Sequence, residues 1–336
     1  MRNKKIDYLR VAAVFFVVWL HSVYDKVYPT LFAHIGSLPV HIFFLLAGYF
    51  AYGKSDGKIL KRVLYFVLIY ILANLFYLAV NCIINNQTTI EYVKGLLSVG
   101  ILKFLLQLFA FNTLIPSGTG GHLWYLSALI VAFLALVIVR RKFLLFFAAV
   151  LYSIGLLLSR YVLPFMDVTV SSYCFRNGIF EATPMVFLGY YLHSIKEKTD
   201  VIYNYKKKLF VLSAMVIAFC YFSLLLSQNV LNIASDLSLR VVVLSVTLTL
   251  LALYPYKTQT KFGNCVAFIG ARLTLAIYII HPLFICLYVK VLNGFLITLA
   301  SFISALVVSL IYFLVKKYFI SLIKVIARRL KKNAEN

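Results

Sequence analysis

Residues 7–22, DYLRVAAVFFVVWLHS, place an arginine and a histidine in an apolar run that is otherwise suited to cross a membrane. A bilayer core is spanned by about 20 residues of helix. Comparable apolar runs follow one another from residue 8 to residue 319, which leaves no room for a separate soluble domain. With 63% hydrophobic and 13% charged residues, the composition excludes an ordinary soluble globular protein. The sequence therefore predicts an all-α, polytopic membrane helix bundle that forms a single domain over residues 1–336.

About ten transmembrane helices are expected. Their approximate bounds are 7–24, 36–53, 59–82, 122–140, 143–159, 176–195, 208–226, 238–255, 270–290 and 295–315. An even number of spans puts both termini on the same side of the membrane. The basic residues decide which side, because loops rich in Lys and Arg stay in the cytoplasm. With the N-terminus inside, the inner segments hold 25 of the 33 basic residues, so both termini are predicted to be cytoplasmic.

Three segments lie between or beyond these spans. Residues 91–114 are apolar but interrupted by charge, and we expect an interfacial or re-entrant helix on the outer side. Residues 257–272 are expected to form an inner loop. Residues 316–336 are expected to form a basic cytoplasmic tail, either as an amphipathic helix on the inner leaflet or as a solvated segment. The net charge of +23 is assigned to topology and to anionic membrane lipids, and no nucleic-acid partner is expected.

Arg10 and His21 are the residues that membrane burial explains least. A charge inside a transmembrane helix costs at least a few kcal/mol, so such residues are candidates for function. Eleven positions separate the two, which puts them on nearly the same face of a helix and about 16 Å apart along its axis. Arg10 lies near the inner boundary and His21 lies deep toward the outside. The alternative is an arginine that snorkels to the interface and an unrelated interfacial histidine.

With these residues in view, the sequence resembles the acyltransferase 3 family of bacterial membrane proteins. The resemblance rests on the spacing of Arg10 and His21 and on four pieces in the family's order. These are PVHIFFLLAGYF (39–50), GGHLWYLSALI (120–130), RNGIFEATPMVFLGYYL (176–192) and AIYIIHPLF (276–284). The resemblance implies a multi-pass enzyme of the bacterial plasma membrane. Such an enzyme moves an acyl group, commonly acetyl, from cytoplasmic acyl-CoA to a hydroxyl of a cell-surface glycan or its lipid-linked precursor.

The donor is expected to bind at the inner side. Because the nucleotide of acetyl-CoA carries several negative charges, Arg10, Lys61 and Arg62 are predicted to bind it in an electropositive mouth. His21 is predicted to be the catalytic residue. Its imidazole can act as a general base on the acceptor hydroxyl or as a nucleophile that forms an acyl-imidazole, and both roles stay open.

Two further residues are expected inside the membrane. His281 lies in mid-span next to Pro282, which frees a backbone carbonyl, and is predicted to line the substrate tunnel. Glu181 is predicted to be catalytic by orienting His21, or to bind sugar hydroxyls. Its alternative is a structural ion pair with Arg176, which is also a predicted substrate-binding residue.

Three residues of the expected outer side complete the predicted substrate site. His122 and Trp124 begin one span, and the indole is either a stacking platform for a sugar or an interface anchor. His41 is predicted to face the acceptor, with structural packing as the alternative.

The five cysteines are scattered and lack CxxC spacing, so no metal site is expected. The sequence leaves a second functional class open, a transporter of a small polar solute such as an amino acid. Transporters often contain inverted repeats, and the two halves of this chain show none.

Overall fold

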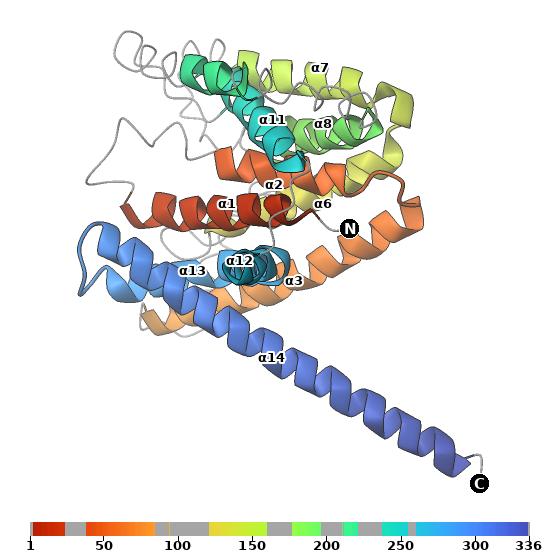
Figure 1. Ribbon diagram of the computed structural model, residues 1–336, viewed down its shortest axis with the longest axis vertical. Coiled ribbons are helices and arrows are strands. Elements are labelled where there is room, and N and C mark those ends of the chain that lie inside the picture. Colours follow the sequence, from red (N-terminus) through yellow and green to blue (C-terminus); the bar gives the residue numbers. More distant parts are fainter. Residues whose placement is uncertain are drawn as a thin grey trace. The chain divides into compact units, whose positions relative to one another are not determined.

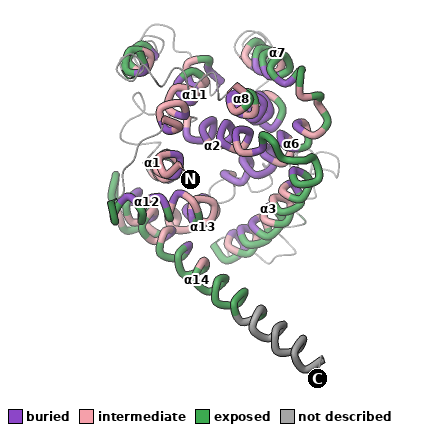
Figure 2. The backbone as a smooth tube through the Cα atoms, turned by 45° about the vertical axis from the view of Figure 1, so that its right-hand side comes forward, coloured by how far each residue is buried: buried purple, intermediate pink, exposed green. Residues whose placement is uncertain are grey.

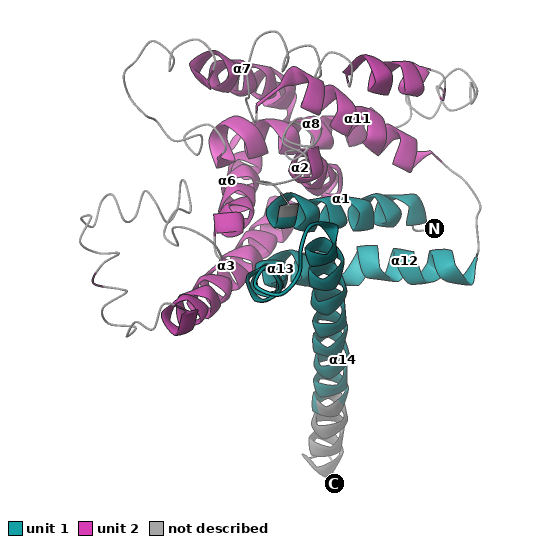
Figure 3. Cartoon of the chain, turned by 90° about the vertical axis from the view of Figure 1, so that its left-hand side faces the viewer, with its two compact units in different colours: residues 1–23, 257–336 teal, residues 24–256 magenta. Residues whose placement is uncertain are grey.

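The computed structural model describes residues 3–23, 38–84, 94, 121–159, 177–195, 210, 212–220, 237–254 and 260–334. Within these ranges the regular secondary structure is helical and contains no strand, which confirms the predicted all-α class (Figure 1). The predicted interfacial segment 91–114 lies outside the described residues except for Lys94. The chain forms two compact units, residues 1–23 with 257–336 and residues 24–256 (Figure 3).

The first unit joins the N-terminal helix to three C-terminal helices. They are α1 (Lys4–Val23), α12 (Lys261–Arg272), α13 (Thr274–Tyr288) and α14 (Phe295–Ala334). Helix α1 packs against all three of the others. Its approach to α12 requires Gly270, because a Cβ atom there would lie 1.9 Å from the carbonyl oxygen of Asp7. At the other end of α1, the hydroxyls of Ser22 and Thr298 lie 2.5 Å apart and join α1 to α14. Helix α1 is thereby fixed within this unit at both ends.

The structure corrects the expected inner loop at 257–272. Residues 261–272 form α12, which begins where the Thr260 hydroxyl accepts a hydrogen bond of 3.0 Å from the backbone N–H of Gly263. Helices α12 and α13 meet at Leu273 with a bend of 79°. The charge count places a segment on one side of the membrane, but it does not show that a short amphipathic piece of that segment is helical.

The C-terminal helix is longer than the last predicted span. Helix α14 continues without a break past residue 316 to Ala334. Its apolar stretch, which is long enough to cross a membrane, covers Phe295–Ser321. The tail expected from residue 316 thus begins as a direct extension of the spanning helix.

Besides the helical residues 212–220, the second unit contains the following elements. They are α2 (Leu38–Tyr49), α3 (Asp56–Ile84), the 3₁₀ turn η2 (Gly121–Leu123), α6 (Trp124–Ile138), the 3₁₀ turn η3 (Arg141–Phe143), α7 (Leu144–Leu157), the π-helical turn η7 (Gly178–Ala182), α8 (Thr183–Ser194) and α11 (Leu239–Leu253). Helix α2 packs against α8 and α11 and is buried over most of its length (Figure 2). A Cβ atom on Gly48 would lie 1.9 Å from the Val186 carbonyl oxygen, and one on Gly189 would lie 1.9 Å from that of Leu45. These two glycines let α2 and α8 pack backbone to backbone, as small residues commonly do in membranes.

Several described helices are suited to a bilayer by length and composition. Three of them are long and apolar enough to cross it, Asp56–Ile84, Gly121–Ile138 and Phe295–Ser321, and the bent pair α12–α13 gives a fourth if it is counted as one span. Helices α2 and α11 are apolar but shorter. The count of about ten spans and the cytoplasmic position of both termini stay predictions.

Candidate active site

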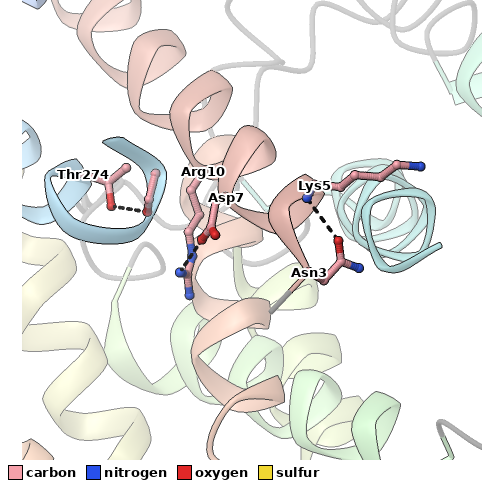
Figure 4. Close-up of polar contacts among 6 residues, drawn as sticks. Asn3, Lys5, Asp7, Arg10 and Thr274 are labelled. Carbon is pink, nitrogen blue, oxygen red and sulfur yellow. Dashed lines mark hydrogen bonds and ion pairs between the residues drawn. The ribbon is translucent and has the colours of Figure 1, made fainter. Parts of the chain in front are cut away.

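Helix α1 carries Arg10 and His21, the two polar residues noted in the first predicted span. The guanidinium of Arg10 donates a hydrogen bond of 3.3 Å to Asp7 Oδ1, and Asp7 lies one turn earlier on the same helix (Figure 4). The carboxylate of Asp7 is 3% exposed and the Arg10 side chain is 23% exposed. Asp7 therefore offsets and orients the charge of Arg10, and the Arg10 side chain stays partly exposed.

His21 lies near the end of α1 and has an exposed side chain. Its ring meets the ring of His281 on α13, with 5.4 Å between the ring centroids and a tilt of 40°. His281 is fully buried. The structure thus brings together two of the predicted site residues, one accessible and one buried, from opposite ends of the sequence.

The ring of His281 is fixed by its own helix. Its Nδ1 lies 2.7 Å from the backbone carbonyl oxygen of Tyr278. Pro282 follows directly inside α13 and has no N–H to donate. The carbonyl that Pro282 would bond in a regular helix is that of Tyr278, so the imidazole replaces the missing donor.

Glu181 and His41 form a pair in the second unit. Glu181 Oε1 lies 3.3 Å from His41 Nδ1, and both side chains are fully buried. Burying a carboxylate is costly unless it is hydrogen-bonded or paired, so this contact has structural weight whatever else the pair does. The partner expected from the sequence, Arg176, lies outside the described residues.

The backbone that presents Glu181 is a single π-helical turn, η7, directly before α8. Asn177 caps this turn, because its side-chain oxygen accepts hydrogen bonds from the backbone N–H groups of Ile179 and Phe180, at 2.8 and 3.0 Å. At its other end the Thr183 hydroxyl donates to the Gly178 carbonyl at 2.6 Å. Single π-helical turns occur frequently at functional sites, where they change the direction of one side chain.

The remaining predicted substrate residues are packed inside the second unit. His122 in η2 is buried, and its ring meets the edge of Tyr77 on α3 with 5.1 Å between centroids. Trp124 is 4% exposed and packs edge-to-face with Phe44 on α2, at 6.1 Å. In this arrangement the indole belongs to the packing between helices, whereas a stacking platform for sugar would need an open face.

The two basic residues predicted on the second span differ in their surroundings. Lys61 on α3 is exposed. Arg62 is half-buried, and its guanidinium lies 5.7 Å from the ring centroid of Phe133 on α6. This cation–π contact holds Arg62 against α6.

The sequence-based reasoning missed several neighbours of the site residues, and three of them show why. The partners of Arg10, His281 and His122 are Asp7, the Tyr278 carbonyl and Tyr77. Asp7 has a detectable signal, because it lies three residues before Arg10 and side chains at this spacing meet on a helix. The Tyr278 carbonyl is also identifiable, as the group left without a helical donor by Pro282. Tyr77 carries no signal, because its contact depends on how two helices pack.

Comparison with known proteins gives one match to a family and one to a curated protein. A family model described as an acyltransferase domain matches residues 3–315. An amino-acid racemase of Enterococcus faecalis is 26% identical over 349 residues, an alignment that covers 90% of this chain and 45% of the racemase. The chain thus spans about half the length of that relative. No solved structure matches the chain.

Proposed function

The chain belongs to the acyltransferase family whose domain model matches residues 3–315, and on this premise we propose that it transfers acetyl from acyl-CoA to a hydroxyl of a cell-surface glycan or its lipid-linked precursor. The proposed setting is a bacterial plasma membrane, with the donor on the cytoplasmic side. The family and the apolar helices make the chain a membrane acyltransferase. The donor, the acceptor and the sidedness belong to the proposal.

The observation that carries this proposal is the pairing of an accessible imidazole with a buried one inside the first unit. His21 is exposed, and the ring of His281 lies beside it, with 5.4 Å between the ring centroids. An imidazole can remove the proton of an acceptor hydroxyl or attack a thioester directly. Either route transfers the acyl group and releases CoA as a thiol.

The acyl donor, acyl-CoA, is proposed to bind to the basic residues. Arg10 lies on the same helix as His21. A guanidinium that donates one hydrogen bond to a carboxylate keeps further N–H groups that can bind a phosphate of CoA. Lys61 and Arg62 on α3 stay predicted donor-binding residues of the second unit. Acetyl-CoA is the first donor to test.

The second unit is proposed to recognise the acceptor through Glu181 and His41. A buried pair of this kind has the hydrogen-bonding capacity that sugar hydroxyls require. His122 and Arg176 stay predicted acceptor residues, and the packed indole of Trp124 takes no part in this proposal.

The experiment uses purified protein, acetyl-CoA labelled in the acetyl group, and a panel of cell-envelope glycans and lipid-linked saccharides. Wild type is expected to transfer label to one acceptor class, and His21→Ala is expected to transfer none while it still binds acetyl-CoA. His193→Asn is the matched control, since its amide can keep the donor for the Tyr49 carbonyl, which His193 Nδ1 contacts at 2.8 Å. Label retained on the protein distinguishes the nucleophile from the general base. Uptake of a polar solute without consumption of acetyl-CoA would overturn the proposal in favour of a transporter.

A further inference from the structure

His21 lies in the last turn of α1, two residues before the helix ends at Val23. Helix ends fray readily, because their last C=O groups have no N–H partner within the helix. A catalytic imidazole at such a place needs support, since an error of about 1 Å in its position can lower a rate by about 10²-fold. The next residue, Ser22, makes a side-chain contact that leads out of α1.

The hydroxyl of Ser22 lies between two partners. It donates to the backbone carbonyl of Trp19 at 3.0 Å, and its oxygen lies 2.5 Å from Oγ1 of Thr298 on α14. A hydroxyl has one proton to donate. Because the proton of Ser22 is used within α1, the Thr298 hydroxyl is the donor in the bond between the two helices. Thr298 is fully buried in the first turn of α14, so this bond is shielded from water.

Aromatic side chains of α1 pack on α14 along the same face as Ser22. The rings of Phe15 and Trp19 meet the ring of Phe295, with centroids 6.3 and 5.6 Å apart. Positions 15, 19 and 22 are spaced by four and three residues, so their side chains form one stripe on the helix. The rings hold this stripe against α14, and the bond from Thr298 fixes the last turn of the stripe.

His21 takes its neighbour from a different helix. It lies about 100° around α1 from Ser22, and its ring lies beside that of His281 on α13, with 5.4 Å between the centroids. The last turn of α1 therefore contacts α13 through one residue and α14 through the next. Since α13 and α14 also pack directly on each other, the two contacts together fix how this turn is rotated.

We propose that Thr298 is a positioning residue for His21. Its hydroxyl holds the side chain of Ser22 and thereby fixes the helical turn that carries the imidazole. Neither hydroxyl takes part in the chemistry. The inference rests on the proposed catalytic role of His21 and adds to it a residue of the C-terminal helix.

Thr298→Val removes the hydroxyl and keeps the shape of the side chain. We expect kcat for CoA release from acetyl-CoA to fall about three- to tenfold, the effect of losing one hydrogen bond between helices in a membrane. KM for acetyl-CoA is expected to change little, because the donor is proposed to bind at Arg10. Thr298→Ser keeps the hydroxyl and is expected to retain at least half of the wild-type kcat. A wild-type kcat in Thr298→Val, or a serine variant no better than the valine variant, would overturn the inference.

Ser22→Ala removes the other half of the contact and is expected to lower kcat by a similar factor. The double variant Ser22→Ala/Thr298→Val is expected to be no slower than the slower single variant, because both substitutions remove the same bond. Losses that multiply would show that the two hydroxyls act separately, which contradicts the proposal.

Tyr288→Phe is the matched control. The Tyr288 hydroxyl lies 2.7 Å from Oγ of Ser304 and joins α13 to α14 in the same unit. This bond has the same chemistry as the bond from Thr298, but it has no end on α1. Its loss is expected to change kcat by less than twofold. If Tyr288→Phe lowers kcat as much as Thr298→Val, a general loosening of the helices explains both effects and the inference fails.

Hydrogen exchange keeps the inference distinct from the proposed function. The backbone amides of residues 19–23, followed by mass spectrometry of the purified protein, are expected to exchange at least threefold faster in Thr298→Val than in wild type. Thr298→Ser and Tyr288→Phe are expected to exchange as wild type does. If wild type releases no CoA, the function fails for that donor, and the exchange rates still decide whether Thr298 holds this turn. Unchanged exchange in Thr298→Val would overturn the inference even in an active enzyme.

Discussion

Glu181 Oε1 lies 3.3 Å from Nδ1 of His41, and neither side chain exposes any surface. The pair joins η7, the turn that leads into α8, to α2 within the second unit. A buried pair stabilises a structure little compared with an apolar replacement, but loss of one member leaves the other without its partner. This asymmetry makes the pair testable by substitution.

Glu181→Ala is expected to lower the free energy of unfolding by about 1–3 kcal/mol, the usual cost of leaving a buried polar atom, here His41 Nδ1, without its partner. His41→Ala is expected to cost a similar amount, and the double substitution less than the sum of the two. The measurement is the thermal unfolding midpoint of the purified protein in one detergent. Effects of the two single substitutions that add to within about 0.5 kcal/mol would mean that the residues are not coupled.

The crossing of α2 and α8 predicts a strong effect of a single methyl group. Gly48→Ala and Gly189→Ala each place a Cβ atom 1.9 Å from a carbonyl oxygen of the facing helix, so the helices must separate. Each variant is expected to lose several degrees in unfolding midpoint and to reduce the yield of folded protein.

Gly57→Ala is the matched control for this pair of variants. Gly57 lies in the first turn of α3, where an added Cβ meets nothing within 4 Å. This substitution is expected to be neutral or to stabilise by up to about 1 kcal/mol. A Gly48→Ala protein as stable as Gly57→Ala would contradict the close packing of α2 on α8.

Arg10 is predicted to bind the donor through its guanidinium while Asp7 holds it in place. Arg10→Lys keeps the charge but loses the planar fork that can contact a carboxylate and a phosphate together. We expect KM for acetyl-CoA to rise about tenfold with kcat nearly unchanged. The measurement is CoA release over a range of acetyl-CoA concentrations.

Lys5→Gln is the control for Arg10, because Figure 4 shows the Lys5 side chain on the same helix and directed away from Arg10. It is expected to change KM by less than twofold. If Arg10→Lys and Lys5→Gln behave alike, the basic residues of α1 serve topology and do not contact the donor.

Much of the fold was predictable, because a helix that crosses the bilayer needs a long apolar stretch, and such stretches are visible in the sequence. Helices α3 and α14 lie where long apolar stretches predict them, and α1 begins at Lys4, close to the predicted start of the first span. The bend at Leu273 was not predictable, because it depends on tertiary packing. One continuous span has much the same composition as two helices that meet at an angle. A helix in the tail from residue 316 was one of the two predicted alternatives, but its continuity with the last span was not predicted, because a rise in charge marks the edge of the membrane and does not end a helix.

The candidate site was predictable in its residue types and only partly in its pairings. Arg10, His21, Glu181 and His281 were identified because polar groups are costly in lipid, and this cost can be estimated from the sequence. Their partners depend on which helices touch. The pairing of Glu181 with His41 joins residues that are 140 positions apart, and no local pattern connects them.

The catalytic role of His21 is tested most directly by the rate at which purified protein releases CoA thiol from acetyl-CoA in the presence of the glycan panel, compared between wild type, His21→Ala and His193→Asn. Wild type and His193→Asn are expected to release CoA, and His21→Ala is expected to lose at least 10²-fold in rate while it still binds acetyl-CoA. Equal rates in wild type and His21→Ala would contradict a catalytic role for His21.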